Sequence, residues 1–213
     1  SRVVATKNLV DGFQRVKEKP KVLLSASAVG LYGHRGEDEL NETSNPGEGF
    51  LAALTTNWES EATKLNIAGT RVVPIRAGLV LSLKGGALPT LLRITKLGLG
   101  GRLGSGNQWW PWIHIKDLLG LIIFALENNV EGPLNATSPV PVRQIDFARS
   151  LGNSVGKPNI FAAPEFALKL FLGQFSSEIL NSRKVYPSKA IQAGYPFLFP
   201  SINSALENLL LEE

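Results

Sequence analysis

Cysteine and methionine are absent from this sequence of 213 residues, and histidine occurs only twice, at His34 and His114. Without cysteine the chain has neither a disulfide framework nor a thiolate metal site. Two histidines are too few for a histidine-rich metal site. We therefore expect no metal centre built from these residue types, and we look for chemistry elsewhere in the sequence.

A long apolar run is also missing. The longest candidate, Leu118–Leu126, is shorter than the ~18 residues that suggest a membrane-spanning helix, and it contains Gly120. Basic residues are scattered along a chain of net charge +4, and their densest cluster, Arg15–Lys21, is interrupted by Glu18 and Pro20. That cluster is typical of a solvated helix end rather than of a nucleic-acid surface. We expect a soluble intracellular protein with no nucleic-acid partner and no membrane span.

The composition that is present, with 44% hydrophobic and 19% charged residues, is that of a globular protein. Continuous apolar segments, typical of strands buried on both faces, occur at Lys21–Ala28 and Thr70–Leu81. Segments with helical periodicity alternate with them. The predicted helices are Ser1–Glu18, Phe50–Leu65, Ala87–Leu97 and Lys116–Asn128. This alternation predicts an α/β fold with a largely parallel sheet.

The pattern changes after Pro139, beyond which predicted helices dominate. They cover Val142–Val155, Pro164–Leu172 and Ser201–Leu211. We therefore predict two domains. Residues 1–139 contain the sheet, and residues 140–213 form a smaller, mostly helical C-terminal subdomain.

Two glycine-rich stretches suggest phosphate loops, but neither has the required spacing. "GNSVGKP" (Gly152–Pro158) is one residue short of a Walker loop, lacks the hydroxyl residue after Lys157, and follows no predicted strand. "GLGGRLG" (Gly98–Gly104) places its third glycine out of register and runs from a helix into a strand. A dinucleotide fingerprint needs the opposite order, because the helix N-terminus must face the phosphate. We expect no phosphate loop here.

Ser105, His114 and Asp117 have the residue types of a hydrolytic triad, but Ser105 lies in no G-x-S-x-G elbow. We interpret His114 as a core histidine that is hydrogen-bonded to a nearby group such as Asp117. Glu59, which follows Trp58 on a predicted helix, is interpreted as a surface charge. A hydrolytic centre is therefore not the leading hypothesis.

Six stretches occur in an order that is typical of one superfamily: "VLLSASAVGLYG", "GFLAALTTNWE", "TRVVPIRAGLVLSLKGGAL", "LGLGGRLGSGNQWWPWIHIKDLLGLIIFALEN", "GPLNATSP" and "QAGYPFLFP". Together they resemble the short-chain dehydrogenase/reductase superfamily. Within it, the sequence is similar to the atypical, NAD-dependent epimerase/dehydratase-like "epimerase family" proteins, which carry a C-terminal domain of unknown function. The long glycine- and tryptophan-rich stretch is the most specific of the six.

The resemblance implies a Rossmann-type parallel sheet that binds NADP(H), or alternatively NAD(H). The family pattern begins with a first strand and a G-x-x-G-F-x-G loop that holds the pyrophosphate, and nothing in this sequence matches that loop. We therefore expect these residues to be the C-terminal part of the Rossmann fold. The N-terminal part would be supplied by the same chain or by a partner chain.

Typical members of the superfamily transfer a proton through a Tyr-x-x-x-Lys pair, and this sequence has no such pair. By comparison with the family pattern, Leu51 takes the tyrosine position and Thr55 takes the lysine position. Neither side chain transfers a proton at neutral pH. The resemblance leaves Tyr32 and the strand-end residue Ser27 as candidate catalytic residues. The alternative for Tyr32 is a packed side chain with a hydrogen-bonded hydroxyl.

Ligands of α/β proteins lie at the carboxyl ends of the strands, and this rule places the strand-end residues among the candidate cofactor contacts. The resemblance implies Arg2, which matches an arginine that follows a serine at this helix start in the family. The candidate cofactor contacts are Arg2, Ser25, Ala26, Ser27, Arg76, Ala77 and Gly78. The candidate substrate-side residues are Gly85, Gly86, Arg102, Gln108, Trp110, Trp112 and His114. The alternative for the second set is a glycine-rich connection with an aromatic anchor, and for Arg2 it is a solvated residue at a helix start.

The leading hypothesis is an NADP(H)-binding oxidoreductase or nucleotide-sugar-epimerase-like enzyme with an unknown small-molecule substrate. One alternative is a catalytically degenerate dinucleotide-binding regulator or scaffold, for example in cell or plastid division. Another is a subunit of a larger assembly. The expected location is the cytoplasm, or the plastid stroma in a photosynthetic eukaryote.

Overall fold

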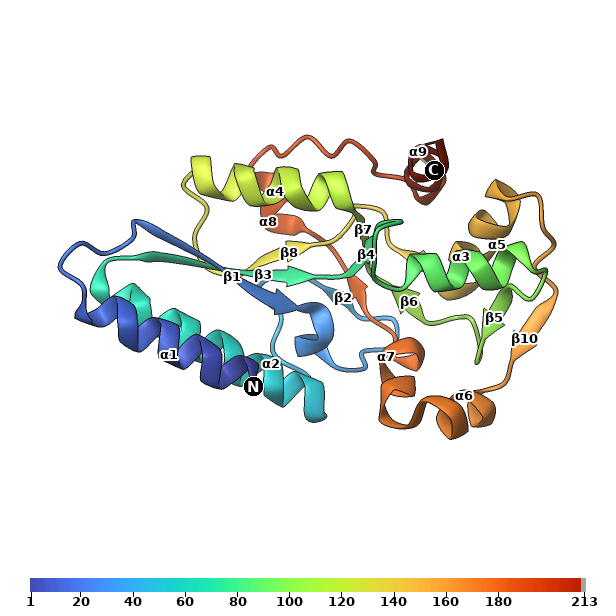
Figure 1. The fold of residues 1–213 in the computed structure, drawn as a ribbon, viewed down its shortest axis with the longest axis horizontal. Helices are drawn as coiled ribbons and strands as arrows, with labels where there is room; N and C mark the ends of the chain where they lie inside the picture. Colours follow the sequence, from blue (N-terminus) through green and yellow to red (C-terminus); the bar gives the residue numbers. More distant parts are fainter. Residues whose placement is uncertain (212–213) are drawn as a thin grey trace.

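A parallel sheet with helices on both faces forms one half of the computed structural model, which describes residues 1–211 (Figure 1). Its strands are β1 (Val22–Ala28), β3 (Arg71–Ala77) and β8 (Leu134–Ala136), in the order β1-β3-β8. Helices α1 (Arg2–Arg15) and α2 (Phe50–Thr63) cover one face, and α4 (Ile115–Glu127) and α8 (Ser188–Gln192) cover the other. The predicted α/β fold with a parallel sheet is confirmed.

Strand β1 pairs with β3 along its whole length, from Val22 opposite Arg71 to Ala28 opposite Ala77. Among residues 1–211, no strand pairs with the other edge of β1. Most of its residues are half-buried and Ala26 is exposed. Helices α2 and α4 pack against β1 from the two faces of the sheet, as expected, and its residues are only partly covered because β1 lies at the open edge.

The strand predicted over 70–81 and the aromatic segment over 109–114 are each broken at one residue. The segment predicted as one strand over 70–81 is β3 and then β4 (Leu79–Leu81), which leaves the main sheet at Gly78. The aromatic segment is interrupted by Pro111, giving β6 (Trp109–Trp110) and β7 (Trp112–His114). The two breaks pack together, since the N–H of Leu79 donates to the carbonyl oxygen of Pro111 at 2.7 Å.

The second half of the molecule is built on short strands, of which those at residues 101–103, 142–143 and 161–163 were not revealed by the sequence patterns. β4 pairs with β7, and β6 pairs with β9 (Val142–Arg143). β5 (Gly101–Leu103) pairs with β10 (Phe161–Ala163). These pairs are two or three residues long, too short to show a period in the sequence.

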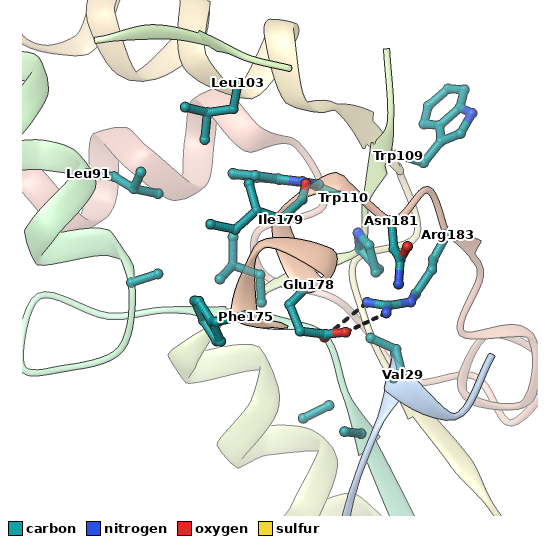
Figure 2. Close-up of a pocket in the computed structure, with 17 residues that line it drawn as sticks. Val29, Leu91, Leu103, Trp109, Trp110, Phe175, Glu178, Ile179, Asn181 and Arg183 are labelled. Carbon is teal, nitrogen blue, oxygen red and sulfur yellow. Dashed lines mark hydrogen bonds and ion pairs between the residues drawn. The ribbon is translucent and has the colours of Figure 1, made fainter. Parts of the chain in front are cut away.

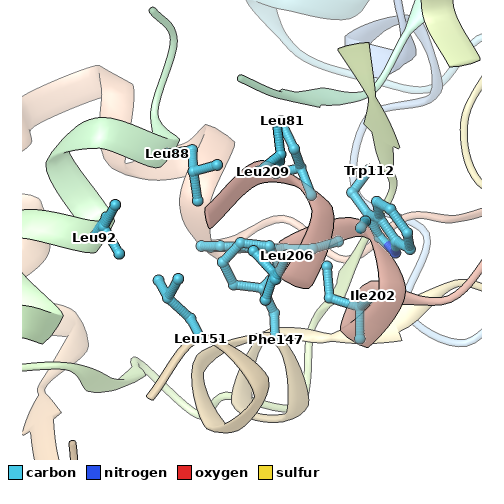
Figure 3. Close-up of a cluster of buried hydrophobic side chains, with 11 residues drawn as sticks. Leu81, Leu88, Leu92, Trp112, Phe147, Leu151, Ile202, Leu206 and Leu209 are labelled. Atoms are coloured by element: carbon cyan, nitrogen blue, oxygen red, sulfur yellow. The ribbon is translucent and has the colours of Figure 1, made fainter. Parts of the chain in front are cut away.

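Three helices enclose the core of this second half, which Figure 3 shows. They are α3 (Leu88–Lys96), α5 (Gln144–Ser154) and α9 (Ile202–Leu211). All three were predicted, with ends that differ by one or two residues. Leucine is the commonest of their buried residues, and Phe147 packs against Trp110 with ring centroids 5.5 Å apart.

The C-terminal segments bridge the two halves. Helix α6 (Glu165–Leu172), the turn η3 (Gly173–Phe175) and helix α7 (Ser176–Leu180) lead to β11 (Lys184–Val185). β11 pairs with β2 (Glu39–Leu40), which lies in the loop before α2. The predicted boundary between residues 139 and 140 stays a prediction.

Within residues 1–211, none of the helices combines the length and the apolar character needed to cross a membrane.

Removing a core ring should destabilise the fold much more than removing an exposed one. Phe147 is 1% exposed, whereas Phe171 on α6 is 82% exposed. We expect Phe147→Ala to lower the free energy of unfolding by about 3–5 kcal/mol and Phe171→Ala to change it by less than about 0.5 kcal/mol. Urea unfolding followed by circular dichroism measures both, and equal losses would contradict the core described here.

Candidate functional site

A buried ion pair joins the end of β3 to helix α2. The guanidinium of Arg76 donates to the carboxylate of Glu59 through two bonds, Nε to Oε1 at 2.9 Å and Nη2 to Oε2 at 2.8 Å. The two side chains are 8% and 12% exposed. The interpretation of Glu59 as a surface charge is therefore wrong, because this face of α2 packs against the sheet. Burial, the largest single effect, opposes the charge of Arg76, but its hydrogen bonds to Glu59 and Tyr32 and the electrostatic effects of these two groups together outweigh it, so the pKa of Arg76 is raised.

The phenol of Tyr32 is part of the same polar cluster. Its hydroxyl donates to Oδ1 of Asn135 at 2.8 Å and lies 3.0 Å from the carbonyl oxygen of Asn41. It accepts a hydrogen bond from Nη1 of Arg76 at 2.9 Å. The side chain is fully buried, and burial raises the pKa of Tyr32 while Arg76 offsets part of that effect. This geometry is that of the packed, hydrogen-bonded alternative; a catalytic role for Tyr32 stays a prediction.

The other candidate cofactor residues have different surroundings. Ser27 is buried and its hydroxyl donates to Glu59. Ser25 and Ala26 precede it on the open edge strand β1, half-buried and exposed respectively. Arg2 lies over the ring of Trp58, with its guanidinium carbon 5.0 Å from the ring centre.

A cavity of about 350 Å³ opens at the carboxyl ends of β1 and β3 (Figure 2). This is the edge at which α/β proteins bind ligands. Two candidate cofactor residues, Ala77 and Gly78, line it. The full lining is Ala28, Val29, Gly30, Ala77, Gly78, Leu79, Ala87, Leu91, Leu103, Trp109, Trp110, Pro111, Phe175, Glu178, Ile179, Asn181 and Arg183.

The polar side of this cavity comes from the C-terminal part of the chain, and the sequence analysis missed it. Glu178 on α7 accepts two hydrogen bonds from Arg183, at 3.1 Å from Nη1 and 2.6 Å from Nη2. Nε of Arg183 donates to the carbonyl oxygen of Gly33 at 2.8 Å. Arg183 is 4% exposed, so the pair forms part of the wall rather than of the surface. The only sequence signal was a run of polar residues in "SSEILNSR".

A second hollow, of about 610 Å³, adjoins the first. The two share Gly30, Phe175, Glu178, Asn181 and Arg183. The second extends to the start of α2, where Gly49, Phe50, Leu51 and Ala52 line it. Together the two hollows run from the ends of the sheet to the N-terminus of α2.

Gly30 lies at the point where three parts of the structure meet: the ends of the strands, helix α2 and helix α7. A β-carbon placed on Gly30 would lie 3.7 Å from Cβ of Leu51, 3.9 Å from Oε2 of Glu178 and 4.0 Å from Oγ1 of Thr55. The two positions that hold tyrosine and lysine in typical superfamily members therefore face Gly30. The carboxylate of Glu178 reaches the same point from the C-terminal part of the chain.

Among the candidate substrate-side residues, Trp110 lines the cavity. Its indole N–H donates to the carbonyl oxygen of Ile179 at 3.0 Å. Gln108 is buried outside the lining and donates to the carbonyl oxygens of Leu103 and Ile179. It therefore positions the loop before β6 against α7.

The remaining candidates lie outside the cavity lining. Trp112 and His114 are fully buried, and Nδ1 of His114 accepts a hydrogen bond from the backbone N–H of Lys116 at 3.0 Å. The interpretation of His114 as a core residue is confirmed. Gly85 and Gly86 are exposed in the turn before α3, and Arg102 is exposed on β5.

Gly78 shows why a small residue is needed at this edge. A β-carbon on it would lie 2.6 Å from the carbonyl oxygen of Pro111. The close approach that glycine permits there is thus made by the protein's own backbone. Among the described residues, no group of three or more histidine, aspartate or glutamate side chains is arranged to hold a metal ion.

Comparison with known proteins identifies a family. The model of the NAD dependent epimerase/dehydratase family matches residues 1–137, and a domain of unknown function, DUF1731, matches residues 163–209. An epimerase family protein of Staphylococcus aureus is 40% identical over 216 residues, a match that covers 100% of this chain and 71% of the relative. One from Staphylococcus epidermidis is 41% identical over 214 residues, covering 99% and 71%.

Solved structures agree with these matches. The human epimerase family protein SDR39U1, crystallised with NADPH, has a TM-score of 0.95 and 34% identity over 100% of this chain and 73% of that chain. The nucleoside-diphosphate sugar epimerase of Corynebacterium glutamicum has a TM-score of 0.83 and 32% identity, covering 100% and 42%.

Breaking the buried ion pair should be costly, because it leaves the charge of Arg76 without its partner. We expect Glu59→Gln to lower the free energy of unfolding by about 3–5 kcal/mol. Glu61→Gln, on the same helix, removes a pair with the half-exposed Lys64 and should cost less than about 1 kcal/mol. Chemical unfolding of the two variants tests this, and a loss no larger for Glu59→Gln than for its control would contradict it.

Proposed function

This chain belongs to the NAD-dependent epimerase/dehydratase family, and on that premise we propose that it is an NADP(H)-dependent oxidoreductase or epimerase-like enzyme acting on a small molecule. The human relative's crystallisation with NADPH supports NADP(H) as the cofactor, with NAD(H) as the second choice. The observation that carries the proposal is the cavity at the carboxyl ends of β1 and β3.

The strand ends suit the nicotinamide end of such a cofactor. Most of the residues that line the cavity at the ends of β1 and β3 are small. They are Ala28, Gly30, Ala77 and Gly78, with Val29 as the larger exception before Leu79. A flat ring needs such a shallow wall, because larger side chains would fill the space. A β-carbon on Gly30 would make only ordinary van der Waals contacts, with no atom closer than 3.7 Å.

Arg183 and Glu178 are the residues that we propose to handle the reacting oxygen. When bound, NADP(H) supplies or accepts a hydride. Arg183 uses three N–H donors on Glu178 and Gly33, and a guanidinium has further donors for a substrate oxygen. A fixed positive donor of this kind stabilises negative charge that develops on that oxygen. Glu178 holds the guanidinium in place and is an acceptor for a substrate hydroxyl.

Ser27, with Tyr32, keeps its place as a candidate catalytic residue in this proposal, although its hydroxyl is bonded to Glu59. Ser25 and Ala26 are supported as cofactor contacts by their position on the open edge strand β1. Arg2 is supported by its position at the start of α1. Arg76 would act by holding this region rigid, because its donors are directed to Glu59 and Tyr32.

We also infer that the free edge of β1 is completed by further strands, from the same protein or from a partner chain. The support is that parallel strands usually lie inside a sheet, and that a long open edge with unpaired backbone groups is usually covered or paired. The relatives' bacterial source supports a cytoplasmic location.

Filling the space at Gly30 should impair cofactor binding. In the full-length protein we expect Gly30→Leu to weaken NADPH binding about tenfold or more, since the side chain would enter the cavity. Gly30→Ala should have a smaller effect, because its β-carbon makes ordinary contacts. Titration of protein fluorescence with NADPH measures the affinity.

Gly12→Leu is the control, because Gly12 lies on α1 with no atom within 4 Å of an added β-carbon. It should leave NADPH affinity unchanged. Wild-type affinity in a folded Gly30→Leu variant would overturn this placement of the cofactor.

A further inference from the structure

The cavity at the strand ends has one apolar side and one charged side. Its apolar side is formed by Leu79, Leu91, Leu103, Trp110, Phe175 and Ile179. Figure 2 shows Leu91 and Leu103 away from the ion pair of Glu178 and Arg183. The charged and amide side chains of the lining all fall within residues 178–183.

The polar atoms near the apolar side are already used. The indole N–H of Trp110 donates to the carbonyl oxygen of Ile179, and the amide of Gln108 donates to Leu103 and Ile179. A ligand hydroxyl placed there would lose its hydrogen bonds to water and gain few in return. Burial of such a group without a partner is costly.

A diphosphate is also poorly matched to the charged end. Arg183 is the cation in the described lining, and its charge is balanced by the carboxylate of Glu178 at 2.6 Å. A diphosphate group usually binds unpaired cations or backbone N–H groups at a helix N-terminus. The lining of this cavity offers it a neutral ion pair whose carboxylate would repel it, and the residues that begin α2 line only the adjoining hollow.

From this asymmetry we propose that the cavity binds an apolar carbonyl compound, or the corresponding alcohol, rather than a nucleotide sugar. This proposal rests on the proposed NADP(H)-dependent function. The apolar body lies among Leu91, Leu103 and Ile179, and the reacting oxygen faces Arg183. At about 350 Å³, the cavity is near the small end of the ~300–1,000 Å³ range of ligand sites.

In the proposed reaction the cofactor is the only oxidant or reductant besides the substrate. In reduction, the carbonyl carbon gains a hydride and its oxygen gains a proton from solvent, so a ketone becomes a secondary alcohol while NADPH becomes NADP⁺. Arg183 stabilises the oxygen as it acquires negative charge. The same groups act in reverse on the alcohol.

Octan-2-one and UDP-glucose are the probes for the full-length protein, each tested with NADPH present. Calorimetric titration measures binding, and absorbance of NADPH measures turnover. We expect saturable binding and turnover of octan-2-one, and no binding of UDP-glucose. Binding of UDP-glucose, or no response to octan-2-one in protein that binds NADPH, would overturn this substrate class. Absence of NADPH binding would instead overturn the proposed function.

Two leucines on and beside α3 provide a matched pair of variants. Leu91 lines the cavity, whereas Leu97 at the end of the helix is 69% exposed and outside the lining. Leu91→Asn should weaken octan-2-one binding about tenfold while NADPH affinity stays unchanged. Leu97→Asn should change neither. Equal ketone affinity in folded Leu91→Asn and wild-type protein would contradict the apolar placement.

Discussion

The bidentate ion pair between Arg76 and Glu59 is the interaction on which the arrangement of this site depends. It fixes the end of β3 to α2, while Ser27 bonds to the same carboxylate from β1. Nη1 of Arg76 holds the hydroxyl of Tyr32, which in turn bonds to Asn135 on β8. All three strands of the main sheet and the helix that covers it are therefore joined just before the strand ends.

That cluster determines where the adjoining residues of the chain lie. After Ser27 and Arg76, the strands end at Ala28 and Ala77, the chain leaves the main sheet, and the residues from Ala28 to Gly30 and from Ala77 to Leu79 line the cavity. The polar side chains of Ser27 and Arg76 thus hold the strand ends to α2, and the small residues next to them line the cavity. The donors of Arg76 are directed to the carboxylate of Glu59, the hydroxyl of Tyr32 and the carbonyl oxygen of Glu42.

The sequence was sufficient to predict the α/β fold, the family and the positions of the long helices, because these depend on local periodicity and on long specific stretches such as the one containing "WWPWIHI". It was insufficient for contacts between distant segments. Glu59 has a buried partner that lies 17 residues further along the chain. Glu178 and Arg183 reach the cavity only because α7 packs beside the strand ends, and no local pattern encodes that packing. The bonds of Tyr32, one of them to a residue 103 positions away, were equally invisible in the sequence.

The central claim is that this fold binds NADP(H) at the strand ends, and the nucleotide content of the native protein tests it most directly. Full-length protein would be purified from its source, exchanged free of small molecules, incubated with NADPH and washed. The nucleotide released on gentle denaturation would then be identified and counted. The account predicts about one NADP(H) per chain. Protein that is folded, yet releases neither NADP(H) nor NAD(H), would contradict it.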